Sequence, residues 1–144
     1  MDATSSSNEG RKTVSKYLVF DDVIFRNRAL LLADLKDLGY PEVESGDHLP
    51  LYGYQGDRRP QTAELVIRRQ HIGPASNDLG FRGTPDGYVP IVSEYDVRTL
   101  AGGHFLAKLR TAYSEHVVQE VTRRLHGTAR RTVEGSLIKI TVRY

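Results

Sequence analysis

Cysteine is absent from this 144-residue chain, and so is any long hydrophobic run. Without cysteine the chain can form no disulfide, no thiolate metal site and no cysteine nucleophile. The longest apolar run, residues 29–33, is far shorter than the roughly 20 residues that cross a bilayer. The polar start, MDATSSSNEGRK, contains no hydrophobic signal core. We therefore expect a cytoplasmic protein without a membrane-spanning segment.

The motifs of common catalytic centres are missing as well. The sequence contains neither a G-x-S-x-G serine nucleophile motif nor a Walker-type phosphate loop. Its five histidines, at positions 48, 71, 104, 116 and 126, form no HExxH or other close ligand spacing. A metal site is then conceivable only if the fold assembles it. The sequence thus favours a protein that is not an enzyme, with no catalytic residues, no metal and no cofactor.

The composition, 39% hydrophobic and 26% charged, is typical of a folded globular domain. A chain of this length suits one domain with a single core. Residues 1–15 are rich in serine and other polar residues and show no periodicity, which predicts a disordered tail. Residues 16–144 are therefore expected to form one α+β domain.

Hydrophobic periodicity predicts two helices. The first begins at the N-cap Asn27 and ends at Gly39, and the second spans residues 104–125 and ends near Gly127. Strands are predicted from alternating or β-branched segments at residues 17–25, 40–44, 51–54, 63–69, 78–82, 88–93, 129–134 and 137–144. This order predicts an α+β fold, a mainly antiparallel sheet with two helices packed on one face.

Glycine-containing turns mark the middle of the chain. They occur within the segment Leu51–Arg69 and again at Leu79-Gly80-Phe81 and Asp86-Gly87-Tyr88. Each lies beside residues suited to a strand, which predicts an antiparallel meander. Within residues 63–69, alternation places Leu65 and Ile67 on one face and Val66 on the other.

The second helix carries polar residues within its apolar stripe. Tyr113, His116 and Glu120 lie one turn apart on the side that also bears Phe105, Leu109, Ala112 and Val117. Polar side chains facing a core need partners, because burying them unpaired is costly. One interpretation is a satisfied structural cluster, in which His116 bonds Glu120 and the Tyr113 hydroxyl bonds the sheet backbone. The other is a small-molecule site that uses His116 as a binding group or proton carrier.

Basic residues are concentrated after residue 50. Residues 1–50 carry six Lys and Arg against nine Asp and Glu, and residues 51–144 carry 14 against nine. Arginine grips carboxylates and phosphates with paired hydrogen bonds, so this part of the chain suits an acidic protein surface. With tyrosines as stacking groups, it also suits RNA or another polyanion. The candidate partner-binding residues are Tyr54, Arg58, Arg59, Arg68 and Arg82.

Several of these segments together resemble a known family. They are Leu35–Tyr40, Gly53–Gly56, Ala63–Ile67, Asp78–Phe81, Asp86–Tyr88 and a helical pattern made by Phe105, Leu106, Tyr113, His116, Val117 and Glu120. In order and spacing they are similar to the hypothetical chloroplast reading frame thirty-five family, domain of unknown function 1257. The resemblance spans roughly residues 15–144. It departs from the family at Ser15-Lys16-Tyr17, where members usually have a Ser-His-aromatic tripeptide.

The family has no assigned reaction, and its members are often encoded near an ATPase of the AAA class. The resemblance therefore implies an accessory subunit. We predict a non-catalytic module that binds a larger protein, such as an AAA-class ATPase. An RNA-binding or polyanion-binding module is the alternative, and a small-molecule site around Tyr113, His116 and Glu120 is a second one. The sequence leaves the oligomeric state open.

Overall fold

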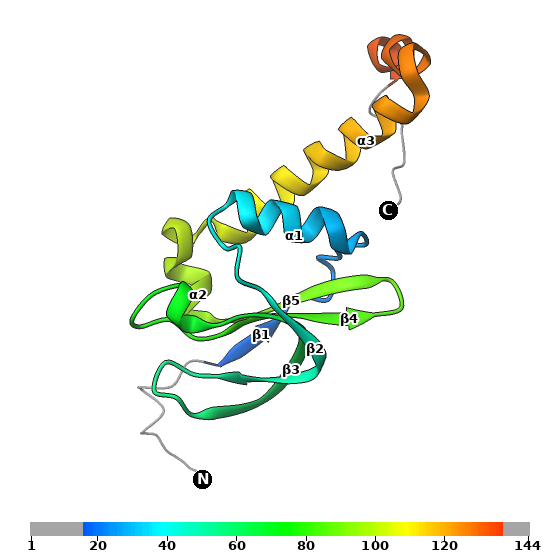
Figure 1. The fold of residues 1–144 in the computed structure, drawn as a ribbon. Coiled ribbons are helices and arrows are strands. Elements are labelled where there is room, and N and C mark those ends of the chain that lie inside the picture. The colour runs from blue at the N-terminus through cyan, green and yellow to red at the C-terminus, as the bar shows by residue number, and fades with distance from the viewer. Residues whose placement is uncertain (1–15, 137–144) are drawn as a thin grey trace.

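The computed structural model describes residues 16–136, with side chains described as far as Leu125. The elements follow in the order β1 (Tyr17–Val19), α1 (Arg28–Asp37), β2 (Glu44–Tyr52), β3 (Arg58–Ile67), η2 (Arg69–His71), β4 (Leu79–Thr84), β5 (Gly87–Ser93), α2 (Glu94–Thr99), η3 (Leu100–Gly103) and α3 (Phe105–Ser136). Five antiparallel strands form one sheet in the order β1-β5-β4-β3-β2. Figure 1 shows α1 and the start of α3 over one face of this sheet, with α2 near its end.

The predicted α+β class and antiparallel meander are found, but the prediction of two helices is wrong. The described residues contain three α-helices. The additional helix, α2, begins directly after β5, where the Ser93 hydroxyl accepts a hydrogen bond from the Asp96 backbone N–H at 3.1 Å. A serine followed three residues later by an acid is a known helix-start pattern, so the sequence did carry this signal.

Several predicted strand boundaries are also wrong, among them that of β3, which was expected over residues 63–69 and spans Arg58–Ile67. The first strand was expected over residues 17–25 but ends at Val19, because the chain turns at Asp21-Asp22, and Phe25 makes only an isolated bridge to Tyr88. Residues 40–43 form no strand, and β2 instead begins at Glu44. It continues through Pro50, which is compatible with the position of β2 at the sheet edge.

The C-terminal prediction fails for a different reason. The second helix was expected to end near Gly127 and to be followed by a strand over residues 129–134, but α3 continues to Ser136. One glycine in a helix costs only about 1 kcal/mol relative to alanine, which neighbouring arginine and alanine residues can offset. The strand predicted over residues 137–144 and the tail predicted over residues 1–15 lie outside the described residues.

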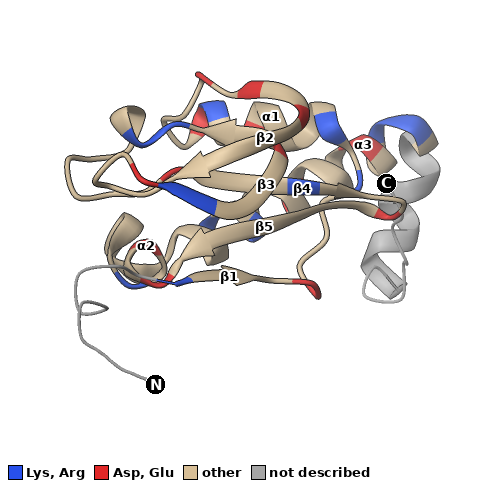
Figure 2. Ribbon diagram, turned by 90° about the horizontal axis from the view of Figure 1, so that it is seen from below, with Lys and Arg blue, Asp and Glu red and all other residues tan. Residues whose placement is uncertain are grey.

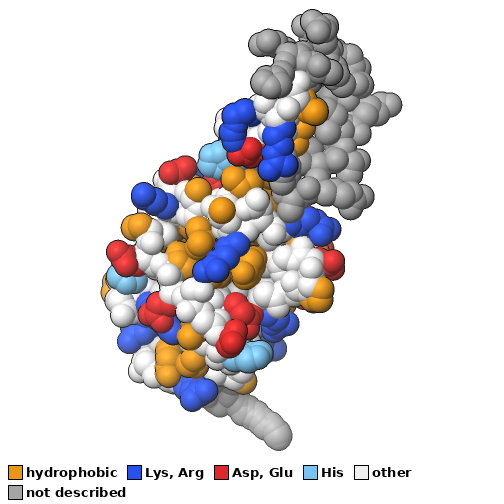
Figure 3. Space-filling model, turned by 45° about the vertical axis from the view of Figure 1, so that its right-hand side comes forward, with side chains coloured by type: hydrophobic (Ala, Val, Ile, Leu, Met, Phe, Trp, Pro, Cys, Tyr) orange, Lys and Arg blue, Asp and Glu red, His pale blue; other side chains and the backbone are white. Residues whose placement is uncertain are grey.

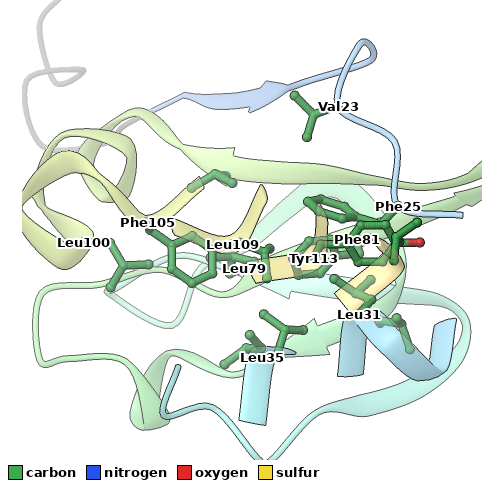
Figure 4. Packing of buried hydrophobic residues seen from close by; sticks show 14 residues of the cluster. Val23, Phe25, Leu31, Leu35, Leu79, Phe81, Leu100, Phe105, Leu109 and Tyr113 are labelled. Atoms are coloured by element: carbon green, nitrogen blue, oxygen red, sulfur yellow. The ribbon is translucent and has the colours of Figure 1, made fainter. Parts of the chain in front are cut away.

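The main core lies between the sheet and the helices. Figure 4 shows Phe105, Leu109 and Tyr113 of α3 packed together with Leu31 and Leu35 of α1 and with side chains from the sheet. The predicted apolar stripe of α3 is thus confirmed by its buried members. As expected, α1 is capped by the Asn27 side chain, which accepts from Leu30 N at 3.0 Å.

The other face of the sheet is covered too. The β2–β3 end of the sheet curls beneath β1 (Figure 1), and a second buried cluster forms there from Tyr17, Leu51, Ala63, Val66 and Ile91. The close approach depends on a glycine in β4. A Cβ atom at Gly80 would lie 2.8 Å from the Ala63 Cβ, which is too close for two carbon atoms. The curled sheet therefore buries apolar residues on both faces.

A buried hydrogen bond joins Tyr17, in this second cluster, to Asp78, the residue that precedes β4. Its hydroxyl donates to the Asp78 carbonyl oxygen at 2.5 Å. Burial, and secondarily the negative charge of Asp78, raises the pKa of the Tyr17 phenol well above its ordinary value of 10.0. The folded protein therefore holds this proton at a pH where the unfolded chain releases it.

The Tyr17 phenol should make stability decline with pH in alkaline solution. Its contribution to the free energy of unfolding is complete below pH 10, the pKa of the phenol in the unfolded chain. Above that pH the contribution falls by up to about 1.4 kcal/mol per pH unit. We expect Tyr17→Phe to lose roughly 1 kcal/mol at pH 8 but to show a shallower decline between pH 9.5 and 11. Urea unfolding across this range measures both effects. Tyr54→Phe, which removes a turn hydroxyl that accepts a hydrogen bond from the exposed Gln55, is the control for losing a phenol outside this hydrogen bond.

Among residues 16–136, no helix combines the length and the apolar character needed to cross a membrane.

Candidate functional site

The predicted polar cluster lies where α3 crosses α1, but its contacts differ from those expected. His116 Nδ1 lies 2.5 Å from Asp34 Oδ1 on α1, and Glu120 instead pairs with Arg123 on its own helix. The Asp34 side chain is completely buried, whereas the His116 side chain is 33% exposed. Burial raises the pKa of the Asp34 carboxyl, and the neighbouring His116 acts in the opposite direction. The partner of His116 therefore comes from another helix.

Tyr113 has a structural contact of its own. Its hydroxyl accepts a hydrogen bond from the Asn27 backbone N–H at 2.7 Å, just before α1 begins. Its ring meets the Phe25 ring edge-to-face, with centroids 5.1 Å apart. Burial raises the pKa of the Tyr113 phenol, and the hydrogen bond from Asn27 opposes this. Tyr113 thus connects α3 to the start of α1 and not to the sheet backbone.

An open cleft of about 390 Å³ lies beside Tyr113, between α3 and the segment before α1. Its lining includes Arg110 and Val118, but neither His116 nor Glu120. The three residues predicted from the sequence are therefore not brought together in one cavity. His116 lies against α1, while Tyr113 borders the cleft.

The Arg68 side chain makes several hydrogen bonds within the fold. Its guanidinium donates to the Pro50 carbonyl at 2.8 Å, to Asp78 Oδ2 at 2.7 Å and to Glu44 Oε1 at 2.9 Å. It also lies over the Tyr52 ring. The Arg68 guanidinium, through its hydrogen bond, lowers the pKa of the Glu44 carboxyl. This network joins β2 and β3 to the residue that precedes β4.

The other predicted partner-binding residues do not form one surface with Arg68. Arg59 lies over the Tyr17 ring, with its side chain only 12% exposed. Arg58 is exposed at the start of β3, and Arg82 borders a separate shallow cleft next to Glu64. The backbone N–H of Tyr54 donates to the Asn77 side chain at 2.9 Å within the β2–β3 connection. Figure 2 shows the Lys and Arg positions spread over several elements and interspersed with acids.

Two buried acids, Asp78 and Asp96, organise the segment before β4, and neither was predicted as a site residue. Asp78, 1% exposed, accepts hydrogen bonds from Arg68, from Tyr52 N at 2.8 Å and from Arg69 N at 2.8 Å. Asp96 Oδ2 accepts from Asn77 N at 3.0 Å and from the Ser93 hydroxyl at 2.9 Å. A polar residue next to an apolar strand is a weak signal, because most such residues are solvated.

Asp34 and Asp37 were also missed. The aspartate at position 34 lies on the same side of α1 as Leu31 and Leu35, and all three are buried. A single acid within an apolar helix stripe could have marked it, because a buried carboxylate requires a partner. Nothing local in the sequence indicates that this partner is His116, 82 positions further along.

The comparison with protein families finds a match over most of the chain. The family model described as "Protein of unknown function (DUF1257)" matches residues 34–136. This range contains Asp34, Asp78 and His116 and is narrower than the resemblance predicted from the sequence, since it omits β1. A search of curated proteins and a search of solved structures each find no match. The link to the chloroplast reading frame stays a prediction. Because the match covers most of its length, the chain belongs to the DUF1257 family of proteins of unknown function.

Proposed function

We propose that the protein is a non-catalytic interaction module that binds a larger protein through α3. The observation that carries this proposal is the way α3 leaves the domain. The helix has 32 residues. Among its residues whose side chains are described, as far as Leu125, the last buried one is Val117, and beyond that point the helix extends away from the sheet (Figure 1). A helix without tertiary packing is only marginally stable in water, so a partner would stabilise this part.

The extension carries an apolar stripe. Val118 and Leu125 are 37% and 48% exposed, and they are the large hydrophobic residues that stand out as exposed in the described part of the chain. They lie seven positions apart and therefore on the same side of the helix, with Val121 between them at the 3–4 spacing of helix–helix contacts. Such a stripe suits the groove or helix of another protein.

The charge of the extension indicates what kind of partner fits. Residues 118–136 include four arginines and two glutamates. Figure 3 shows basic side chains gathered where α3 leaves the domain. A second copy of the same helix would bring like charges together, whereas a partner with acidic residues beside an apolar groove would complement them. An AAA-class ATPase is the partner that the family resemblance suggests, and this identity is part of the proposal.

Replacing the apolar residues of this stripe should weaken partner binding strongly without unfolding the domain. We expect Val118→Gln with Leu125→Gln to reduce recovery of the partner at least tenfold, because burying each side chain contributes about 1.5–3 kcal/mol. Co-purification of tagged protein from its native cell at moderate salt, with partners identified by mass spectrometry, measures this loss. Gln119→Ala, on a neighbouring exposed position of α3, is the matched control and should bind normally.

Two results would count against the proposal. One is recovery of the wild-type protein as a lone monomer, and the other is equal recovery of the same partner by wild type and double variant. Circular dichroism of the double variant should match wild type, because neither side chain belongs to the core clusters.

The aromatic residues support RNA binding less well than α3 supports protein binding. Phe81 is completely buried in the main core, Tyr88 packs against that core, and Tyr52 lies beneath Arg68. Stacking of bases needs exposed ring faces. A steep fall of partner recovery with salt, together with nuclease sensitivity, would instead favour a polyanion.

A further inference from the structure

The crossing of α1 and α3 brings together three side chains with metal-binding atoms. Asp34 and Asp37 are three positions apart on α1 and therefore share a side of the helix. With His116 of α3, they each offer one ligand atom, and these three atoms lie within 4.8 Å of one another. The cluster thus combines one imidazole nitrogen with two carboxylates.

Asp34 supplies a second, independent observation. It is 0% exposed, and its Oδ2 atom is buried without a hydrogen-bond partner among the described residues. Its other oxygen, Oδ1, lies 2.5 Å from His116 Nδ1. A buried carboxylate oxygen without a partner is unfavourable unless a cation or a donor reaches it. The negative charges of Asp37 and Glu115 also act on Asp34, and they increase the preference for a cation.

We propose that Asp34, Asp37 and His116 form a binding site for one divalent transition-metal ion, with Zn²⁺ as the best fit. Imidazole together with carboxylates suits zinc, whereas Mg²⁺ and Ca²⁺ prefer oxygen donors alone. Tetrahedral zinc with bonds of about 2.1 Å needs donor atoms about 3.4 Å apart. Donor atoms up to 4.8 Å apart must therefore approach each other, whereas His116 Nδ1 and Asp34 Oδ1, 2.5 Å apart, must separate to admit the ion. The exposed side chain of Asp37 can make the first of these adjustments.

The surroundings leave a route for the ion and a position for water. Asp37 is exposed and His116 is one-third exposed, so the solvent side of the site is open while Asp34 closes the inner side. Three protein ligands with an open fourth position are compatible with a bound water molecule. Because the ligands come from α1 and α3, the ion would fix the crossing of these two helices. His116 immediately precedes Val117, which is buried in the core.

Zinc titration of the full chain, without a histidine tag and after treatment with chelator, tests the site. We expect one Zn²⁺ per chain by isothermal titration calorimetry, with micromolar or tighter affinity, and a higher melting temperature with zinc than with Mg²⁺. Co²⁺ in place of Zn²⁺ should give the visible absorption of a low-symmetry site. Asp37→Asn and His116→Ala should each weaken zinc binding at least tenfold and reduce the Co²⁺ absorption.

His71→Gln, an exposed histidine outside the cluster, is the matched control and should bind zinc as the wild type does. Absence of zinc binding by the wild type would overturn the proposal, and so would binding that Asp37→Asn and His116→Ala leave unchanged. Asp34 and His116 would then be a structural ion pair only. If His116→Ala fails to fold, Asp37→Asn decides the matter, because its side chain is exposed and lies outside both core clusters.

Discussion

Asp78→Asn is expected to destabilise the protein by about 3–5 kcal/mol, the range found when one partner of a buried ion pair is removed. The Asp78 side chain is 2% exposed, and its Oδ2 lies 2.7 Å from Arg68. The same carboxylate accepts hydrogen bonds from the backbone N–H groups of Tyr52 and Arg69. An asparagine amide removes the charge and can turn an NH₂ group toward these donors, which leaves the donors unsatisfied and Arg68 less well compensated.

Glu44→Gln is the matched control for this prediction. Glu44 is the other carboxylate on Arg68, at 2.9 Å, but its side chain is 54% exposed. Exposed ion pairs contribute about 0–1 kcal/mol, so this variant should unfold at nearly the wild-type urea concentration. Equal losses for the two variants, measured by urea unfolding at pH 7, would mean that Asp78 is not the centre of the network.

The Asp78 network explains much of one segment that identified the family. In Asp78-Leu79-Gly80-Phe81, the Asp78 carboxylate forms an ion pair with Arg68. The side chains of Leu79 and Phe81 are buried in the main core, and Gly80 allows close packing against Ala63. Each of these four positions has a structural role. The resemblance was therefore informative about the fold and said little about chemistry.

Local patterns were sufficient for the elements whose stability is also local. The Asn27 cap and the buried Leu31 and Leu35 made α1 predictable. The alternation around Leu65 and Ile67 made the second half of β3 predictable, but not its start at Arg58. Prediction failed where longer-range interactions decide. Gly127 was taken as a stop, although the energetic penalty of one glycine in a helix is small. The turn at Asp21-Asp22 was not predicted either, because the apolar and β-branched residues on both sides suggested a continuous strand.

Of the residues in the candidate site, His116 was predicted from the sequence, but neither Asp34 nor Asp37 was. His116 was recognised because a polar residue interrupts an apolar helix stripe, and the same logic applied to Asp34 would have found its partner. Their contact depends on how α1 and α3 cross, which no local pattern contains. The arginines show the opposite case. Arg59 and Arg68 were predicted as partner-binding residues from the sequence, and in the fold their guanidinium groups lie over the rings of Tyr17 and Tyr52.

Gly87→Ala is expected to be the other strongly destabilising change, by about 3 kcal/mol or more. Gly87 has a φ of +139°, which residues with a side chain rarely adopt, and that conformation alone costs roughly 1–3 kcal/mol. A Cβ atom there would also lie 2.7 Å from the Phe25 carbonyl oxygen and 2.8 Å from the Arg26 Cα. The obstacle is backbone, so a rotamer change cannot relieve it. Displacing this backbone would disturb Phe25, which is 2% exposed and packs edge-to-face on Tyr113.

Two other glycines separate backbone strain from steric overlap. Gly39 has a φ of +106°, but a Cβ atom there would meet no neighbouring atom within 4 Å, so Gly39→Ala should show the strain alone, about 1–2 kcal/mol. Gly83, on β4, has neither problem, since the nearest atom would be Glu64 Oε1 at 3.4 Å, and Gly83→Ala should change stability by at most about 0.5 kcal/mol. Urea unfolding should therefore rank the losses Gly87, Gly39, Gly83. If Gly87→Ala loses no more than Gly39→Ala, the chain before α1 must be able to move away from β5, and the Phe25–Tyr88 bridge would not be a fixed part of the core.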